Sequence, residues 1–179
     1  MKLNWNVDSS WTLFIDRDGV INERRFDGYV LSKEDFVFKN EVLQVSKSLF
    51  SKFKYVILVT NQQCVGKGLI AMEDLDNIHE YMLDKLNQNS AHIDLILVAP
   101  ELKGTQPEKR KPSPALGYIA RDKFGDINFS KSIMVGDTDS DIDFGRNLGM
   151  KTVLVDSEER TSLEPDLCVN GLIELNELL

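Results

Sequence analysis

Cysteine is scarce in this sequence, and its scarcity limits the kinds of protein that the sequence can encode. Among 179 residues there are two cysteines, Cys64 and Cys168, too few for a disulfide-stabilised scaffold and typical of a reducing cytosol. Long apolar runs are missing as well, since none reaches the roughly 18 residues that a membrane span requires. The first residues, MKLNWNVDSSW, lack the continuous apolar core of a secretory signal. We therefore expect a cytoplasmic protein with no membrane partner.

Basic residues are outnumbered by acidic ones. Lys and Arg total 21 against 29 Asp and Glu, which gives a formal net charge of −8. Such an acidic chain is poorly suited to non-specific nucleic-acid binding, so we expect no nucleic-acid partner. The hydrophobic fraction of 42% is nevertheless enough for a sizeable core. We expect a single domain over residues 1–179, as a monomer or a small homo-oligomer.

Short apolar runs alternate with amphipathic stretches along the chain. Strands are predicted at 11–15, 55–59, 93–99, 132–135, 151–155 and 167–169. Helices are predicted over 41–52 (capped by Asn40), over 72–87, 114–124 and 172–179, and after the fourth strand up to Gly149. Strands separated by helices form right-handed βαβ units, so we predict a Rossmann-like three-layer α/β/α domain with a central parallel sheet.

Two aspartates follow the first predicted strand as Asp16-Arg17-Asp18-Gly19. In parallel sheets covered by helices, ligands bind beyond the carboxyl ends of the strands. A carboxylate pair at this place can share a hard cation such as Mg²⁺, or one carboxylate can attack while the other transfers protons. An acidic surface turn is the alternative interpretation. A calcium loop does not fit, because Gly19 is fourth from Asp16 rather than sixth.

Thr60, Asn61 and Gln62 follow the second predicted strand. A hydroxyl and side-chain amides there can bind phosphoryl oxygens, although capping of the strand end is the alternative. Lys111 follows Arg110 in a later loop and offers a positive charge, for which a solvated basic loop is the alternative.

Four closely spaced aspartates, Asp137 and Asp141 among them, follow the fourth predicted strand. Acidic residues in the first turn of a helix often only complement its dipole. Four of them exceed what capping needs, and their mutual repulsion indicates a bound cation. Because both aspartate clusters follow strands directly, we expect them to share one crevice.

In this order (acid pair, Thr, Lys, acid) the motifs resemble those of the haloacid dehalogenase-like hydrolase superfamily, over nearly the whole chain. The resemblance implies that Asp16 is a nucleophile that forms an aspartyl-phosphate. Asp18 would protonate the leaving alcohol and then activate water. Thr60 would hold the phosphoryl group and Lys111 would neutralise its developing charge. Mg²⁺ would be bound by the Asp16 carboxylate, the Asp18 backbone carbonyl and Asp137.

Asp141 would support the metal or Lys111.

Members of the superfamily usually carry an inserted cap domain. From Gly19 to the first predicted helix there are about two dozen residues, which are too few for such a domain. Between Thr60 and Lys111 the chain is already used by a helix, a strand and a loop. We therefore expect no separate cap domain, and selectivity that comes from loops 20–38, 63–71 and 99–111 or from a partner subunit.

Within the superfamily, RDGVIN, GYV, DFVF and TNQ with a nearby KG are similar to one subgroup. That subgroup contains the D-glycero-D-manno-heptose 1,7-bisphosphate phosphatases and the histidinol-phosphate phosphatases. Of these two groups, the heptose bisphosphate phosphatases are favoured by the segments 28–30, 35–36 and 110–112. The resemblance implies a phosphoric monoester hydrolase of carbohydrate metabolism whose partner is a small phosphorylated metabolite. The candidate substrate-binding residues are Asn61, Gln62, Arg110 and Lys67.

Two alternatives stay open: a histidinol-phosphate phosphatase and, in another class, a phospho-accepting signalling module of the receiver type. The subgroup commonly carries a zinc-binding loop of Cys and His before the Arg-Lys-Pro motif, but residues 100–109 contain neither type. We therefore predict no structural zinc. We expect Cys64 to be a small buried thiol and His79 to lie at a surface or boundary position. We expect Arg24 to be a solvated charge, with contact to the distal group of an anionic substrate as the alternative.

Overall fold

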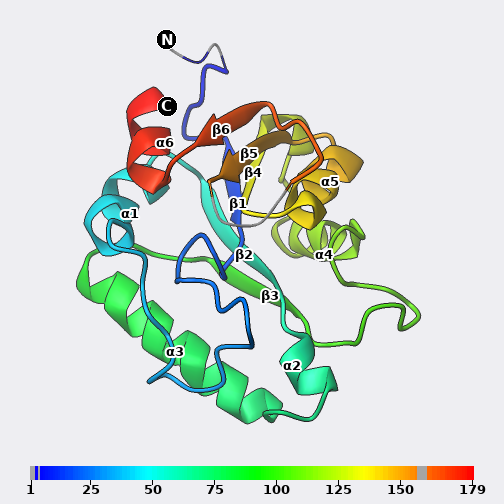
Figure 1. Cartoon of the computed structure of the whole chain (residues 1–179). Coiled ribbons are helices and arrows are strands. Elements are labelled where there is room, and N and C mark those ends of the chain that lie inside the picture. Colours follow the sequence, from blue (N-terminus) through cyan, green and yellow to red (C-terminus); the bar gives the residue numbers. More distant parts are fainter. Residues whose placement is uncertain (1–2, 4, 157–160) are drawn as a thin grey trace.

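The computed structural model describes residue 3, residues 5–156 and residues 161–179. Its sheet is formed by β1 (Thr12–Ile15), β2 (Tyr55–Asn61), β3 (Leu95–Ala99), β4 (Ser132–Gly136), β5 (Lys151–Val155) and β6 (Leu167–Val169). All neighbouring strands are parallel, in the order β3-β2-β1-β4-β5-β6. This order places β1 between β2 and β4 (Figure 1). The prediction of a Rossmann-like fold with a central parallel sheet is confirmed.

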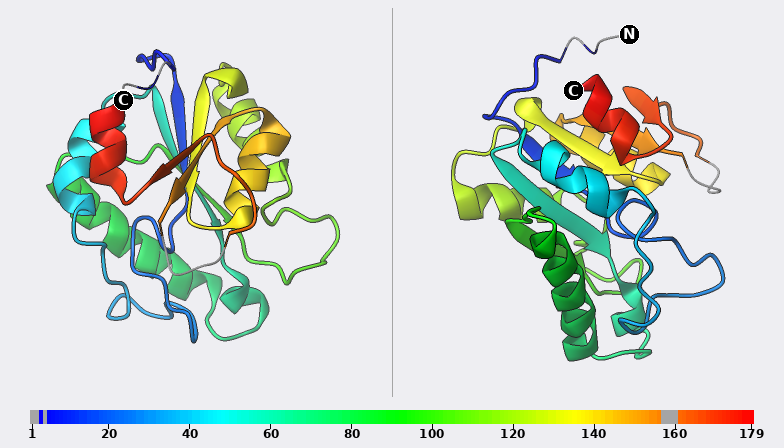
Figure 2. Two further views of the ribbon diagram at one scale, coloured as in Figure 1. Left: turned by 45° about the horizontal axis from the view of Figure 1, so that its top comes forward. Right: turned by 90° about the vertical axis from the view of Figure 1, so that its left-hand side faces the viewer.

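Helices cover both faces of the sheet (Figure 2). One face carries α1 (Val42–Phe50), α3 (Met72–Gln88) and α6 (Leu172–Leu178), and the other carries α4 (Ala115–Phe124) and α5 (Asp139–Leu148). Side chains of β1 alternate between these layers, because Leu13 and Ile15 pack with the first set of helices and Phe14 packs with the second. All three are fully buried. The middle strand is therefore covered on both sides, as parallel strands usually are.

Several element boundaries differ from the expectation. Asn40 does not cap α1: the residue at the cap is Glu41, and its side chain makes no capping hydrogen bond. β3 begins at Leu95 rather than at residue 93, because the Asp94 carboxylate accepts a hydrogen bond from the Val56 backbone N–H at 2.8 Å. The short helix α2 (Gln63–Gly66) and a 3₁₀ turn, η1 (Phe129–Lys131), were not predicted.

The two segments that could carry a cap domain are fully described and contain none. Between β1 and α1 the chain forms one loop with two isolated bridges, and between β2 and α4 it contributes only α2, α3, β3 and loops. Phe36 of the first loop packs against Tyr81 of α3, with ring centroids 6.1 Å apart, so this loop lies on α3 (Figure 1). Within the described residues, every helix is too short or too polar to cross a membrane.

The turn after β1 depends on Gly19. Its φ of +90° lies in the left-handed region that favours glycine. A Cβ at this position would also lie 1.9 Å from Oδ2 of Asp137, which follows β4. Glycine therefore brings the backbone beyond β1 into close approach with the end of β4, where the two aspartate clusters meet.

We predict that Gly19→Ala destabilises the protein more than Gly104→Ala does. Gly104 has nearly the same φ, +86°, but nothing lies within 4 Å of a Cβ built there. Backbone strain alone should make Gly104→Ala cost about 1 kcal/mol in the free energy of unfolding, and the clash with Asp137 should add at least about 2 kcal/mol for Gly19→Ala. Urea unfolding of both variants measures the difference, and equal costs would contradict the close approach.

Candidate active site

A cavity of about 660 Å³ opens where β1 and β2 end. Its volume lies in the range of small-molecule sites. Several of its polar lining side chains are themselves almost completely buried, namely Arg17, Gln62 and Lys111. The sequence-predicted residues that line it are Asp16, Asp18, Asn61, Gln62, Arg110 and Lys111.

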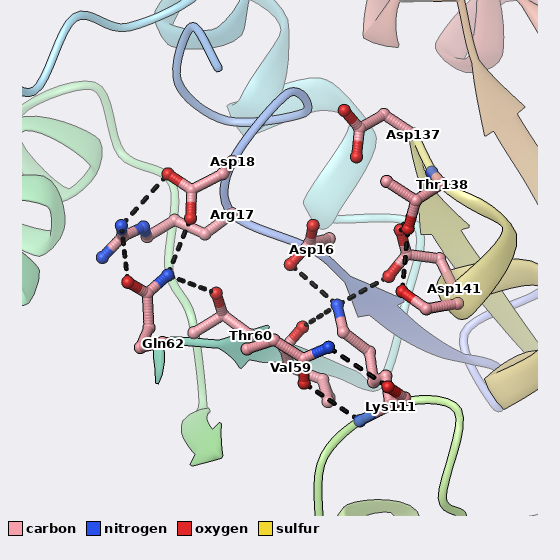
Figure 3. Close-up of polar contacts among 12 residues, drawn as sticks. Asp16, Arg17, Asp18, Val59, Thr60, Gln62, Lys111, Asp137, Thr138 and Asp141 are labelled. Carbon is pink, nitrogen blue, oxygen red and sulfur yellow. Dashed lines mark hydrogen bonds and ion pairs between the residues drawn. The ribbon is translucent and has the colours of Figure 1, made fainter. Parts of the chain in front are cut away.

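Lys111 is buried, and its ammonium group is surrounded by acceptors (Figure 3). Its Nζ lies 2.8 Å from Oδ1 of Asp16 and 2.6 Å from Oδ1 of Asp141, and it donates to the Val59 carbonyl at 2.6 Å. These three acceptors match the three protons of an ammonium group. Burial alone would lower the pKa of Lys111, but the two carboxylates raise it above its usual range. The ammonium therefore stays charged and is fixed in position.

Asp16, Asp137 and Asp141 form a buried carboxylate cluster, with one oxygen of each within 4.8 Å of the others. Burial raises the pKa of Asp16 to about 6, with Asp141 adding to the shift and Lys111 opposing it. Burial and the charges of Asp16 and Asp141 raise the pKa of Asp137 to about 7, although Arg24 donates to both of its oxygens at 2.9 Å. Ionised carboxylates this close need a cation, and their oxygens are the ligands that Mg²⁺ prefers. The cluster fits a magnesium site.

Asp141 faces Lys111 for a local reason. Its Oδ2 accepts hydrogen bonds from the Thr138 backbone N–H at 3.1 Å and from the Thr138 hydroxyl at 2.7 Å. This capping arrangement at the start of α5 leaves Oδ1 for the ammonium. Asp141 was expected to support either the metal or Lys111, and this geometry favours Lys111.

Asp18 points away from Asp137 into a separate hydrogen-bonded group (Figure 3). Its Oδ1 accepts from Arg17 Nη2 and Asn22 Nδ2, each at 3.0 Å, and its Oδ2 accepts from Gln62 Nε2 at 2.7 Å. Burial alone would raise the pKa of Asp18, but the Arg17 charge and these hydrogen bonds lower it. The carboxyl side chain is still 23% exposed, so it remains within reach of the cavity.

The sequence Thr60-Asn61-Gln62 ties several elements together at the end of β2. Gln62 Nε2 also donates to the Thr60 hydroxyl at 2.8 Å, and Gln62 Oε1 accepts from Arg17 Nη2 at 3.1 Å. Asn61 Oδ1 accepts from the Lys111 backbone N–H at 2.9 Å, and Asn61 Nδ2 donates to the Lys111 carbonyl at 3.3 Å. In this structure Gln62 holds Asp18, and Asn61 holds the loop that carries Lys111.

Arg110 and Lys67 occupy different surroundings. Arg110 lines the cavity, and its Nη1 is buried without a hydrogen-bond partner in the described part of the chain. Lys67 is exposed and does not line the cavity. It donates to the hydroxyl of Tyr29 at 2.7 Å, and Tyr29 does line the cavity. Among the described residues, Tyr29 is the one that links Lys67 to the cavity.

Two expectations about charged or titratable residues are wrong. Arg24 is not a solvated charge, because it pairs with the buried Asp137. His79 is 5% exposed rather than at a boundary, and its Nε2 lies 3.1 Å from Nη1 of the buried Arg17. The helical spacing could have revealed this, since His79 follows Leu75 by four residues on the apolar face of α3. The expectation that Cys64 is a buried thiol is confirmed.

This chain is similar in sequence to known phosphatases. A family model described as HAD-hydrolase-like matches residues 109–175. A D-glycero-alpha-D-manno-heptose-1,7-bisphosphate 7-phosphatase of Campylobacter jejuni is 32% identical over 148 residues, which cover 83% of this chain and 83% of that protein. A protein of the same name from Burkholderia mallei is 34% identical over 80% of this chain and 78% of its own length. A D-glycero-beta-D-manno-heptose-1,7-bisphosphate 7-phosphatase of Rhodopseudomonas palustris is 30% identical over 82% of this chain and 83% of that protein.

Among solved structures, the crystal structure of D,D-heptose 1,7-bisphosphate phosphatase from B. bronchiseptica, complexed with magnesium and phosphate, has the same fold. Its TM-score is 0.83 at 24% identity, over 93% of this chain and 96% of that one. The parallel sheet, the strand-end motifs and relatives above 30% identity over most of both chains agree. The chain belongs to the haloacid dehalogenase-like hydrolases, in the family of the D-glycero-manno-heptose-1,7-bisphosphate 7-phosphatases.

Proposed function

We propose that this chain is a Mg²⁺-dependent phosphatase that removes one phosphate from D-glycero-D-manno-heptose 1,7-bisphosphate through an aspartyl-phosphate. One observation carries the proposal: the Asp16 carboxylate lies at the cavity, pairs with Lys111 and packs beside Asp137. A second acid, Asp18, lines the same cavity two residues further along the chain. The named activity of the curated relatives supports the choice of substrate.

Asp16 is proposed as the nucleophile and Lys111 as its electrostatic partner. The Lys111 ammonium already lies on Asp16 Oδ1, so negative charge that develops on a phosphoryl group beside Asp16 meets a fixed positive charge. A preorganised cation of this kind stabilises a transition state without the cost of reorienting solvent. Asn61 supports it by holding the Lys111 backbone at two points.

Asp18 is proposed as the acid that protonates the leaving oxygen and as the base that later activates water. Arg17, Asn22 and Gln62 fix its carboxylate from the protein side, and its exposed fraction of 23% leaves it open to the cavity. Thr60, linked to Gln62 at 2.8 Å, is proposed to hold the phosphoryl group through its hydroxyl.

Asp16 and Asp137 are proposed to hold Mg²⁺, together with the Asp18 backbone carbonyl. When bound, the ion supplies positive charge that draws in the phosphate and polarises it. The fit rests on the donor chemistry, since the cluster offers buried carboxylate oxygens whose pKa values are raised by burial and by one another. Asp141 serves the site through Lys111.

A bisphosphate also needs a place for its second phosphate. Arg110 lines the same cavity as Lys111, and its buried Nη1 has no hydrogen-bond partner in the described residues. A buried guanidinium nitrogen without an acceptor is costly, and an anionic oxygen of a substrate would satisfy it. We therefore propose that Arg110 binds the phosphate that is not transferred. Asn61 and Gln62 line the cavity beside it, and Lys67 is proposed to reach the substrate through Tyr29.

We further propose that residues 1–179 act as one domain in the cytoplasm, as a monomer or small homo-oligomer, without nucleic acid. The net charge of −8 supports the last point, because non-specific nucleic-acid binding relies on positive charge. Two free cysteines support a reducing compartment.

We predict that Asp16→Asn abolishes turnover. The amide cannot attack phosphorus as a carboxylate does, so kcat for an aryl phosphate in the presence of Mg²⁺ should fall by at least about 10³-fold. Asp143→Asn, in the Asp-rich segment after β4 but outside the buried carboxylate cluster, should keep wild-type activity. An active Asp16→Asn variant would contradict the role of Asp16 as nucleophile. Turnover by the wild type without a metal would contradict the dependence on Mg²⁺.

A substrate panel tests the substrate proposal separately. Heptose bisphosphate should give the highest kcat/KM, and Arg110→Ala should reduce it at least about tenfold while changing an aryl monophosphate little. Selectivity for histidinol phosphate would replace the proposed substrate. Long-lived phosphorylation of the protein without phosphate release would favour a receiver-type signalling module.

We predict that the Mg²⁺-induced rise in Tm grows with pH between 5.5 and 7.5. The pKa values of Asp16 and Asp137 are raised to about 6 and about 7, so the metal-free protein loses stability as pH rises through this range and both carboxylates ionise. Mg²⁺ binds the ionised forms, and its affinity should therefore rise at least about tenfold over the same range.

Thermal unfolding with and without Mg²⁺ measures this dependence. Asp137→Asn is the control: it should remove the Mg²⁺-induced shift and leave the metal-free protein at pH 7.5 at least as stable as the wild type. A shift of the same size at both pH values would contradict the assignment of the metal ligands.

A further inference from the structure

The guanidinium group of Arg17 lies in the interior of the protein, with 1% of the residue exposed. Its Nη2 donates to Asp18 Oδ1 at 3.0 Å and to Gln62 Oε1 at 3.1 Å. Its Nη1 lies 3.1 Å from His79 Nε2, and its Cζ lies 5.9 Å from the centroid of the Phe36 ring. A buried guanidinium is costly unless acceptors surround it. His79 is therefore one of the few groups that decide where Arg17 can lie.

The chemistry of this pair fixes the state of the imidazole. A guanidinium has donors and no acceptor, so His79 Nε2 must present its lone pair to Arg17 and carry its proton on Nδ1. Burial, with the Arg17 charge beside it, lowers the pKa of His79 to about 3, which keeps the ring neutral at physiological pH. The acceptor stands on α3, a 17-residue helix whose apolar stripe is packed in the core. Arg17 thus has a rigid anchor that lies outside the cavity.

We propose that His79 is a positioning residue for the proton transfers of Asp18, acting through Arg17. The guanidinium is planar, so an acceptor that fixes Nη1 also fixes the direction of Nη2 toward Asp18 Oδ1. Arg17 Nε is already buried without a hydrogen-bond partner in the described residues. Without the imidazole, Nη1 would become a second such donor, and this added cost favours a shift of Arg17 toward another acceptor. The Asp18 carboxylate then moves with it, and a misplaced acid transfers protons slowly. This inference rests on the proposed function, in which Asp18 is the acid and base.

The experiment compares substrates that differ in their need for an acid. An alkyl phosphate such as heptose bisphosphate has a poor leaving group that Asp18 must protonate, whereas p-nitrophenyl phosphate has a leaving group that departs without a proton. The value of kcat/KM reports events up to departure of the alcohol. His79→Leu should lower kcat/KM for the alkyl phosphate by about tenfold to 100-fold and that for p-nitrophenyl phosphate by less than about threefold.

Two further variants complete the set. His79→Gln keeps an oxygen acceptor near the place of Nε2 and should restore most of the alkyl phosphate activity. His92→Gln changes the other histidine, whose side chain is 73% exposed, and should match the wild type on both substrates. An equal loss on the two substrates, or no loss on the alkyl phosphate, would overturn the inference while the proposed function stands. A wild type that hydrolyses neither substrate would overturn both.

A measurement on the wild-type fold does not depend on how the variants fold. With two histidines in the chain, the ¹⁵N resonances of His79 are assigned by comparison with His92→Gln. They should show a protonated Nδ1 and an unprotonated Nε2 from pH 6 to 8. A protonated Nε2 at pH 7 would overturn the inference.

Discussion

The Lys111 ammonium is the contact on which the rest of the site depends. It joins Asp16 at the end of β1, Asp141 at the start of α5 and the Val59 carbonyl in β2, so three elements converge on one charge. A buried charge is tolerated only when it is paired and hydrogen-bonded. In the described residues the three clustered carboxylates meet the cations of Lys111 and Arg24. A divalent cation would change the balance of this site from negative to positive, which suits an anionic substrate in an acidic protein.

Asp16 and Asp18 are two residues apart, but they have opposite surroundings. Burial among carboxylates raises the pKa of Asp16, while Arg17 and the hydrogen-bond donors around Asp18 lower its pKa. A nucleophile must be ionised and a general acid must carry a proton. A bound cation favours ionised Asp16, and a phosphate dianion nearby favours protonated Asp18. The proposed nucleophile therefore responds mainly to the metal, and the proposed acid responds mainly to the substrate phosphate.

Much of this architecture could be predicted from the sequence, because buried parallel strands are short apolar runs and strand ends are where ligands bind. Asp16, Thr60, Lys111 and Asp137 each follow such a run or lie in a loop beyond one, so their convergence followed from topology. The cap of α1 was predicted wrongly, because a residue suited to capping, Asn40, does not show which turn begins the helix.

The contacts that support the site residues from behind could not be predicted from the sequence motifs. Arg24 and Asp137 are far apart in the chain, and only the folded loop after β1 brings the guanidinium to the carboxylate. Arg17 and His79 are 62 residues apart and meet inside the protein. Composition rules place such charged or polar side chains at the surface. In this protein such side chains are buried because specific acceptors lie beside them. No local sequence pattern reveals those acceptors.

The most direct test of the account is to identify the residue that carries phosphate during turnover. Enzyme that is acid-quenched while it hydrolyses substrate with Mg²⁺ should yield a phosphorylated peptide containing Asp16, and borohydride reduction should convert that residue to homoserine. Phosphate release with no covalent phosphate on the protein, or with phosphate on any residue other than Asp16, would contradict the account.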